Sequence, residues 1–289
     1  MLIRAGFEIT LTCGKNVPLL CALSPYPGLV LPVLGDGAVH SQPRLPLATY
    51  ADAFGNRITR VTAPGGRLVL TSDFVVQHSG ETDPVVPGAR QHPIEELPPE
   101  VLRYLVASRY CESDLLGAEA WARFGHIEGG WARVQAVCDF VHRHITFGYQ
   151  HGRPTKTAFD AFREGNGVCR DFAQLSIALC RALNIPARYA SGYLGDIGVP
   201  YGGPMDFCAW FEVWLGGRWY TFDARYNIPR IGRIVMVRGL DAADVSMITS
   251  YGAHRIERFE VWCDEVPSHL GIDDLRGRMR VVPVEAVAA

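Results

Sequence analysis

The sequence predicts an α+β protein with two domains: a β-sandwich-like domain over residues 1–95, followed by a mixed helix-and-sheet domain over residues 96–289. Two observations support this division. Short strand-like segments separated by Gly, Pro and Asn fill the first 95 residues. Beyond them, apolar residues recur at helical spacing before strand patterns return. We therefore expect a helix packed on an antiparallel sheet in the second domain.

The strand candidates of the first domain are short and are bounded by turn residues. Their sequences are GFEITLTC, LPLATY, RITRVTA and GRLVLTSDFVVQHSG. Their number and spacing are typical of a sandwich. The stretch ETDPVVPGARQHPIEELPPE follows, and its Pro and charged residues predict a linker.

Two helices are predicted most clearly in the second domain. The first lies in GGWARVQAVCDFVHRHITFGY, whose apolar residues recur at helical spacing. The second begins at Cys169 and ends before Pro186. Its apolar stripe is formed by Phe172, Leu175, Leu179 and Leu183.

A β-hairpin is expected where CAWFEVWL and RWYTFDAR flank Gly216-Gly217. If that pair is the turn, Leu215 faces Arg218. Continued back along the strands, this register places Trp210 opposite Asp223 and Cys208 opposite Arg225. Alternation assigns one face to the core, formed by Phe207, Ala209, Phe211, Val213 and Leu215. We expect Cys208, Asp223 and Arg225 to gather on the other face.

Cys169 stands where a helix should begin. A helix N-terminus has unsatisfied N–H groups and partial positive charge, which favour a thiolate. The neighbouring Arg170 is expected to lower the pKa of this thiol further. Cys169 is therefore predicted to be the most reactive of the eight cysteines, and to face Cys208 across a cleft.

The block GVCRDFAQLSIALCRALNIPARY, the CAWFEV hairpin and TFDAR together resemble the bacterial transglutaminase-like superfamily. The later RIGRIVMVRGLDAADVSMITSYG and the N-terminal FGNRITR and SDFVV are also similar to this group. The resemblance implies a papain-like catalytic domain at residues 96–289, preceded by a β domain. It also implies a Cys–His–Asp triad that forms a thioester with an acyl group.

Carried over by motif, the resemblance makes Cys169 the nucleophile and Asp223 the acid. The family motif His-Ala-Trp reads Cys208-Ala209-Trp210 here, so a second thiol replaces the base. Imidazole shuttles protons near neutrality, whereas a thiol has a higher pKa and a single exchangeable proton. The predicted catalytic set is Cys169, Cys208 and Asp223, with Trp210 and Arg225 as substrate-binding residues.

Composition narrows the function classes. The net charge is −2 and no block of Lys and Arg is present, which argues against nucleic-acid binding. No apolar run is long enough for a membrane span, and the N-terminus lacks the apolar core of a secretory signal. We expect a cytoplasmic protein with free thiols, no metal and no cofactor. The sequence does not indicate an oligomeric state.

Four functions remain open at this point. The first is acyl transfer or amide hydrolysis through Cys169, on a peptide or small amide substrate. The second is a cofactor-independent racemase or epimerase that uses Cys169 and Cys208 as paired acid and base on an amino-acid or peptidyl substrate. The third is a peptide-binding pseudoenzyme. The fourth is a disulfide or metal site built from Cys169, Cys208 and Asp223.

Overall fold

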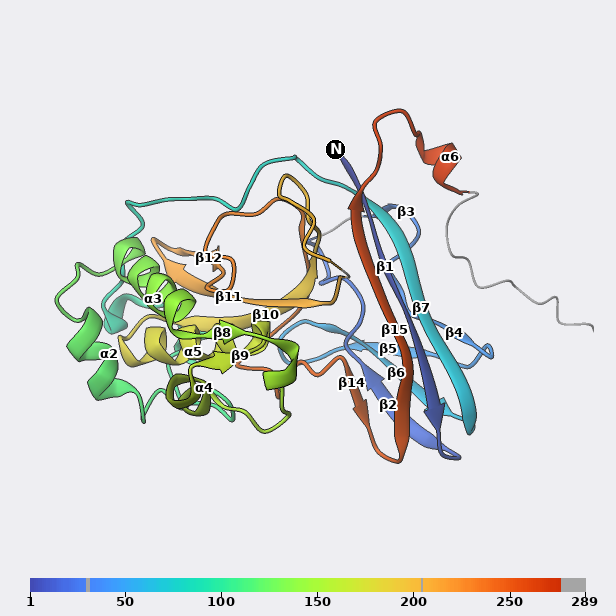
Figure 1. Cartoon of the computed structure of the whole chain (residues 1–289), viewed down its shortest axis with the longest axis horizontal. Helices are drawn as coiled ribbons and strands as arrows, with labels where there is room; N and C mark the ends of the chain where they lie inside the picture. Colours follow the sequence, from blue (N-terminus) through green and yellow to red (C-terminus); the bar gives the residue numbers. More distant parts are fainter. Residues whose placement is uncertain (30–31, 204, 277–289) are drawn as a thin grey trace, which may run out of the picture.

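The computed structural model describes residues 1–29, 32–203 and 205–276. Long strands gather on one side of the molecule, together with the short C-terminal helix, and the other labelled helices lie on the opposite side with a smaller sheet (Figure 1). The predicted α+β class is confirmed, including the helix of Cys169 packed on an antiparallel sheet.

Two sheets form the strand-rich side. One has the order β15-β1-β7-β3 with β4 also paired to β7, and the other has the order β14-β2-β6-β5. Their strands are β1 (Leu2–Cys13), β2 (Val17–Cys21), β3 (Pro32–Leu34), β4 (His40–Gln42), β5 (Ala48–Ala51), β6 (Arg57–Ala63), β7 (Gly66–Gln77), β14 (Ile248–Ser250) and β15 (His254–Glu265).

β1 is the central element of the first sheet. It pairs antiparallel with β7 on one side and with β15 on the other. Its alternate residues face the core and are fully buried, namely Ile3, Ala5, Phe7, Ile9 and Leu11. β14 and β15 thus complete sheets built mainly from residues 1–95, although the sequence places them in the range 96–289. The division into two domains stays a prediction.

The helical side is organised around α5 (Cys169–Ala182). This helix packs on β10 (Ala187–Leu194) and β11 (Cys208–Leu215), and against α2, α3 and α4. Every residue from Asp171 to Arg181 is buried, because the helix lies between the sheet and other helices. The other helices are α1 (Pro99–Leu102), α2 (Gly117–Phe124), α3 (Trp131–His144), α4 (Ala158–Glu164) and α6 (Ile272–Arg276), with 3₁₀ turns at Ile94–Glu96 and Tyr149–His151.

The sheet under α5 has the order β12-β11-β10-β13, with β12 (Arg218–Phe222) and β13 (Arg233–Gly239). Leu215 pairs with Arg218 as the sequence predicts. Gly216 and Gly217 both have positive φ, 54° and 85°, which suits a two-residue hairpin turn. β8 (Thr146–Phe147) and β9 (Asn166–Gly167) form a parallel pair, and β9 directly precedes α5 in the chain.

The two faces of β11 separate as the alternation predicts. Phe207, Ala209, Phe211, Val213 and Leu215 belong to the main core. Cys208 and Trp210 belong to a smaller cluster on the other face, which Cys169 also contacts. The ladder between β11 and β12 ends at the pair Phe211–Phe222. The predicted pairs of Trp210 with Asp223 and of Cys208 with Arg225 are therefore wrong as sheet partners.

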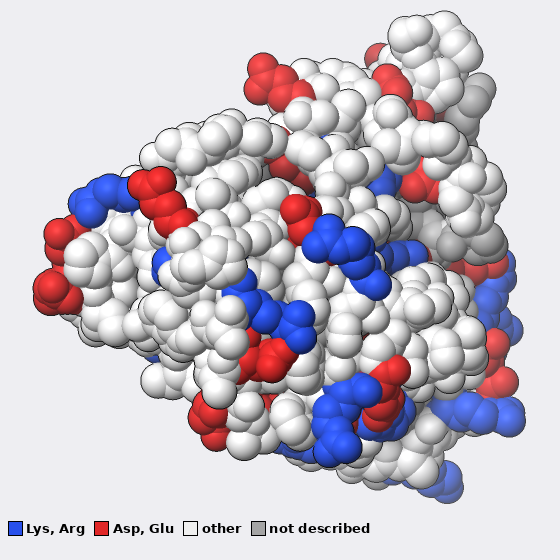
Figure 2. Space-filling view, turned by 60° about the vertical axis from the view of Figure 1, so that its left-hand side comes forward, with Lys and Arg blue, Asp and Glu red and all other residues white. Residues whose placement is uncertain are grey.

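The charge of the surface and the character of the helices complete the description of the fold. Lys and Arg are interspersed with Asp and Glu on the face drawn in Figure 2. Within the described ranges, no helix combines the length and the apolar character required to cross a bilayer.

Candidate active site

A cavity of about 540 Å³ opens at the N-terminal end of α5. Cys169 and Cys208 both line it, together with Asp206, Arg225 and Tyr226. The structure thus brings three of the predicted site residues to one cavity. Asp223 lines a neighbouring cavity of about 330 Å³ instead.

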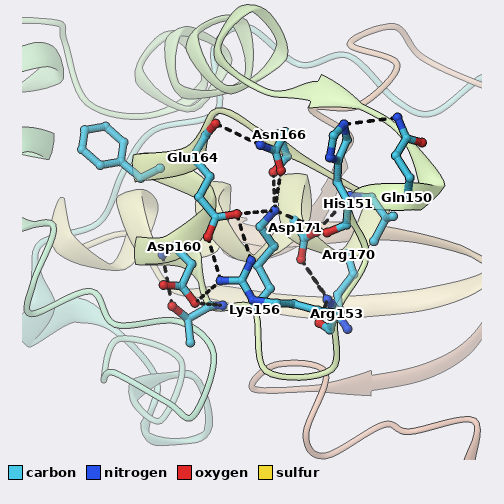
Figure 3. Close-up of polar contacts among 12 residues, drawn as sticks. Gln150, His151, Arg153, Lys156, Asp160, Glu164, Asn166, Arg170 and Asp171 are labelled. Atoms are coloured by element: carbon cyan, nitrogen blue, oxygen red, sulfur yellow. Dashed lines mark hydrogen bonds and ion pairs between the residues drawn. The ribbon is translucent and has the colours of Figure 1, made fainter.

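The chain just before Cys169 is held by buried polar contacts (Figure 3). Lys156 is fully buried, and its Nζ donates to the carbonyl and the side-chain oxygen of Asn166, at 2.8 and 2.7 Å. Glu164 forms an ion pair with the same ammonium at 3.0 Å. A buried ammonium needs such partners. The backbone at Asn166, three residues before Cys169, is fixed as a result.

The first turn of α5 is fixed by Asp171. Its carboxylate accepts a hydrogen bond from the amide of Val168 at 2.9 Å, which satisfies a donor at the helix start. Burial raises the pKa of Asp171. Arg170 pairs with this carboxylate at 3.1 Å and donates to the carbonyl of Arg153 (Figure 3). The guanidinium of Arg170 is therefore committed to Asp171, not to the Cys169 thiol as the sequence suggests.

Cys169 is the first residue of α5, as predicted. It is half-buried, whereas the other seven cysteines are buried. Its pKa is lowered, first by a hydrogen bond from the Cys208 thiol, and also by the charge of Arg225 and the amide of Ala209. Burial and the nearby Asp206 oppose this shift. Cys169 is thus the more acidic thiol of the pair.

Cys208 is the first residue of β11 and is 4% exposed. Its pKa is raised well above the usual range, chiefly because it donates to Cys169 and also because it is buried. The carbonyl of Ala209 offers its S–H a second acceptor at 3.8 Å. Two thiols whose pKa values are shifted in opposite directions therefore line one cavity.

Asp223 directly follows β12 in the chain and is 6% exposed. One carboxylate oxygen accepts from the amides of Arg225 and Tyr226, and the other forms an ion pair with Arg233 at 2.9 Å. The negative charge of Asp223 still raises the pKa of Cys208. Asp223 is close enough to act on Cys208 electrostatically, while its hydrogen bonds go to other groups.

Arg233 is the partner of Asp223 that the sequence does not reveal. It also pairs with Asp83 at 2.8 Å, and its guanidinium lies 4.9 Å from the ring centre of Trp210. Trp210 is 1% exposed and does not line the cavity of Cys169. The prediction that Trp210 contacts substrate stays a prediction, and in this structure its indole lies against the guanidinium of Arg233.

Two further cavity residues were missed from the sequence. Asp206 comes from the loop before β11, and burial raises the pKa of its carboxyl. Tyr149 comes from the 3₁₀ turn before α4, and burial likewise raises the pKa of its phenol. No periodic pattern marks either residue, because both lie in irregular segments.

Among the described residues, the site has neither a histidine in its lining nor a cluster of metal ligands. The lining of the cavity includes no histidine there, and His151 instead lies in the polar network of Figure 3. All eight cysteines are free. Within residues 1–29, 32–203 and 205–276, no three His, Cys, Asp or Glu side chains are grouped so that they could hold a metal ion.

The segment that carries the candidate site matches a known protein family. Residues 119–224, which include Cys169, Cys208 and Asp223, match the model of the transglutaminase-like superfamily. These residues form a transglutaminase-like core. The recognition made from sequence motifs is thereby confirmed, while the exchange of His for Cys208 is a feature of this chain that the family match does not test.

A solved structure resembles the whole chain around this transglutaminase-like core. It is a candidate cysteine protease from Cytophaga hutchinsonii, with a TM-score of 0.79 and 26% identity, covering 94% of this chain and 92% of that one. The periplasmic domain of TgpA from Pseudomonas aeruginosa, bound to ethylmercury, has a TM-score of 0.40 and 14% identity over 75% of this chain and 91% of that one. The second similarity is too low to support an inference.

An uncharacterized protein of Mycobacterium leprae is 33% identical over 96 residues, which are 31% of this chain and 33% of the relative. The match thus spans about a third of that relative's length. Together with the transglutaminase-like core, the similarity to the Cytophaga structure supports a thiol-dependent enzyme of the hydrolase or acyltransferase kind.

Proposed function

We propose that this protein is a cysteine enzyme that hydrolyses an amide or transfers its acyl group through Cys169, with Cys208 in the place of the usual imidazole. One observation carries the proposal. The only cysteine with a lowered pKa begins a helix, lines a cavity and packs against the cluster of Cys208, a thiol with a raised pKa. A thiolate in such a position is a nucleophile.

The proposed reaction has two steps. The Cys169 sulfur attacks the amide carbonyl, and the backbone N–H groups at the start of α5 stabilise the oxyanion. The C–N bond then breaks, and the leaving amine takes the proton of the Cys208 thiol. In the second step, water attacks the thioester and gives one proton to Cys208. The C–S bond breaks, which frees the acid and restores the Cys169 thiolate; an amine in place of water gives transfer.

The position of Cys208 supports its role as the proton donor. Cys169 packs against the cluster that contains Cys208, and the raised pKa of Cys208 favours its protonated form. Asp223 contributes at a distance, since its negative charge keeps Cys208 protonated. A thiol is a weaker acid–base catalyst at neutral pH than imidazole. We therefore expect a slower enzyme than one with an intact Cys–His–Asp triad.

A second candidate is an isomerase in which Cys169 removes a proton from carbon and Cys208 returns one. The opposite pKa directions of the two thiols favour it. Against it, two-sided proton transfer needs the substrate carbon between the sulfurs, whereas here the two thiols contact each other. A substrate would have to separate them first. We therefore rank acyl chemistry above isomerisation.

Incubation of the wild-type protein with a panel of amides and peptides in deuterated water tests the choice. We expect hydrolysis or acyl transfer, seen as a change in substrate mass, and its loss in Cys169→Ala. Deuterium at an α-carbon without cleavage would favour the isomerase. Neither change, together with saturable peptide binding, would indicate a pseudoenzyme and overturn the proposal.

A further inference from the structure

A row of stacked side chains lines the cavity on the side of Arg225. The Arg225 guanidinium lies 3.8 Å from the ring centre of Phe147 and 4.7 Å from that of Tyr226. Arg230 lies 4.5 Å from the same Tyr226 ring. All four side chains line the cavity of Cys169. Stacking on two rings holds the plane of the Arg225 guanidinium in one orientation.

Arg225 differs from the neighbouring arginines in its ionic partners. Arg230 pairs with Asp196 at 3.2 Å, and Arg233 pairs with Asp83 and Asp223. Among the described residues, no carboxylate lies within ion-pair distance of the Arg225 guanidinium. The charge of Arg225 lowers the pKa of the buried Asp206 carboxyl, although burial raises it more, and this carboxylate accepts a hydrogen bond from the amide of Phe207.

The guanidinium of Arg225 is therefore available to bind a carboxylate. It is half-buried and aromatic side chains fix it, yet no carboxylate of the described residues pairs with its fork of N–H donors. A guanidinium fork matches a carboxylate bidentately, and such charge-assisted bonds are strong. The same cavity holds the Cys169 sulfur. A carboxylate bound at Arg225 would therefore place nearby atoms of its molecule against the nucleophile.

We propose that Arg225 binds a carboxylate of the substrate, so that the preferred acyl donors are amides that carry a carboxylate close to the scissile bond. This inference rests on the proposed function, because it assumes that Cys169 attacks a group bound in this cavity. A competing role for Arg225 is to lower the pKa of Cys169 alone. In that role it would give no preference for acidic substrates.

Two alkylating reagents separate these roles without requiring a known substrate. Iodoacetate carries a carboxylate and iodoacetamide does not, while both react in the same way. The Cys169 thiolate attacks the CH₂ carbon, a C–S bond forms as the C–I bond breaks, and iodide leaves with the electron pair. The readout is the ratio of the two rates at Cys169, followed by peptide mass mapping and compared with the ratio for N-acetylcysteine.

We expect the iodoacetate-to-iodoacetamide ratio at Cys169 to exceed that of N-acetylcysteine by roughly tenfold. Arg225→Gln should return it to the reference. Arg225→Lys, which keeps the charge but loses the planar fork, should keep only part of the preference. Arg218→Gln is the matched control, since it removes the same charge from the exposed hairpin turn and should leave the ratio unchanged.

The iodoacetate-to-iodoacetamide ratio tests the carboxylate site even if a variant does not fold, because the ratio of the wild-type protein can by itself contradict the proposal. Rapid labelling by iodoacetamide with no preference for iodoacetate would overturn the carboxylate site and leave the proposed function standing. Slow labelling of Cys169 by both reagents would overturn both.

Discussion

The two cysteines of α5 have the same side chain but opposite environments. Cys169 begins the helix, is half-buried and has a lowered pKa. Cys180 lies near the end of the helix, is fully buried, and burial raises its pKa. Cys138 on α3 lies near Cys180, and the pKa of Cys138 is also raised well above the usual range. Burial without a donor therefore makes a thiol inert.

The difference lies in what each sulfur contacts. Cys169 receives hydrogen bonds from a thiol and from a backbone amide, and a guanidinium lies nearby. These contacts outweigh the cost of its burial. For Cys180, the charge of Arg181 opposes the desolvation but does not overcome it. The pKa values of Cys169 and Cys180 therefore differ because of their positions on the helix and the groups across the cavity, more than because of burial itself.

Removal of each sulfur should give the largest contrast. Cys169→Ala should lower kcat/KM for amide cleavage by roughly 10³-fold or more, because the proposed nucleophile is gone, with little loss of stability. Cys180→Ala should keep most of the activity but lower the free energy of unfolding by about 1–2 kcal/mol through a small cavity. Kinetics and urea unfolding of both variants test the contrast. Equal activity in the two variants would contradict it.

The labelling rates of the cysteines should also differ, by a factor smaller than the effect on activity. Cys169 should react with iodoacetamide at least about 100-fold faster than Cys138 or Cys180, which react only when the core opens. Timed labelling followed by peptide mapping measures all three at once. Labelling of Cys138 or Cys180 at the rate of Cys169 would remove the basis of the comparison.

Loss of the Cys208 thiol should bring Cys169 closer to an ordinary cysteine. In Cys208→Ala the main cause of the lowered pKa is absent, so the labelling rate of Cys169 at pH 7 should fall by roughly 3- to 10-fold. Cys263→Ala is a suitable control, because it removes another buried thiol outside the cavity. An unchanged rate in Cys208→Ala would mean that Arg225 and the Ala209 amide suffice.

The sequence predicts those parts of the site that local rules determine. The helix start at Cys169 follows from the apolar stripe, and the Gly216-Gly217 turn fixes the register of β11 and β12. Alternation then puts Cys208 on the face that meets Cys169. These elements are short in sequence and regular in geometry, so propensity and pattern are enough.

The rest of the site depends on contacts between distant segments. Asp223 leaves the strand after Phe222, so its pairing with Arg233 cannot be obtained by extending the register. Arg225 stacks on Phe147, which lies in β8 far back in the chain. Arg170 is turned away from Cys169 because the buried Asp171 needs a partner. Such pairings are decided by tertiary packing, which a single sequence does not display.

The central claim is that the pKa of Cys169 is lowered because Cys208 donates to it. The most direct test is the rate of iodoacetamide labelling at Cys169 as a function of pH. A lowered pKa predicts that the rate reaches half its maximum clearly below the value of about 8.5 for a free cysteine, and that this midpoint rises in Cys208→Ala. A wild-type midpoint at or above that of a free cysteine would contradict the account.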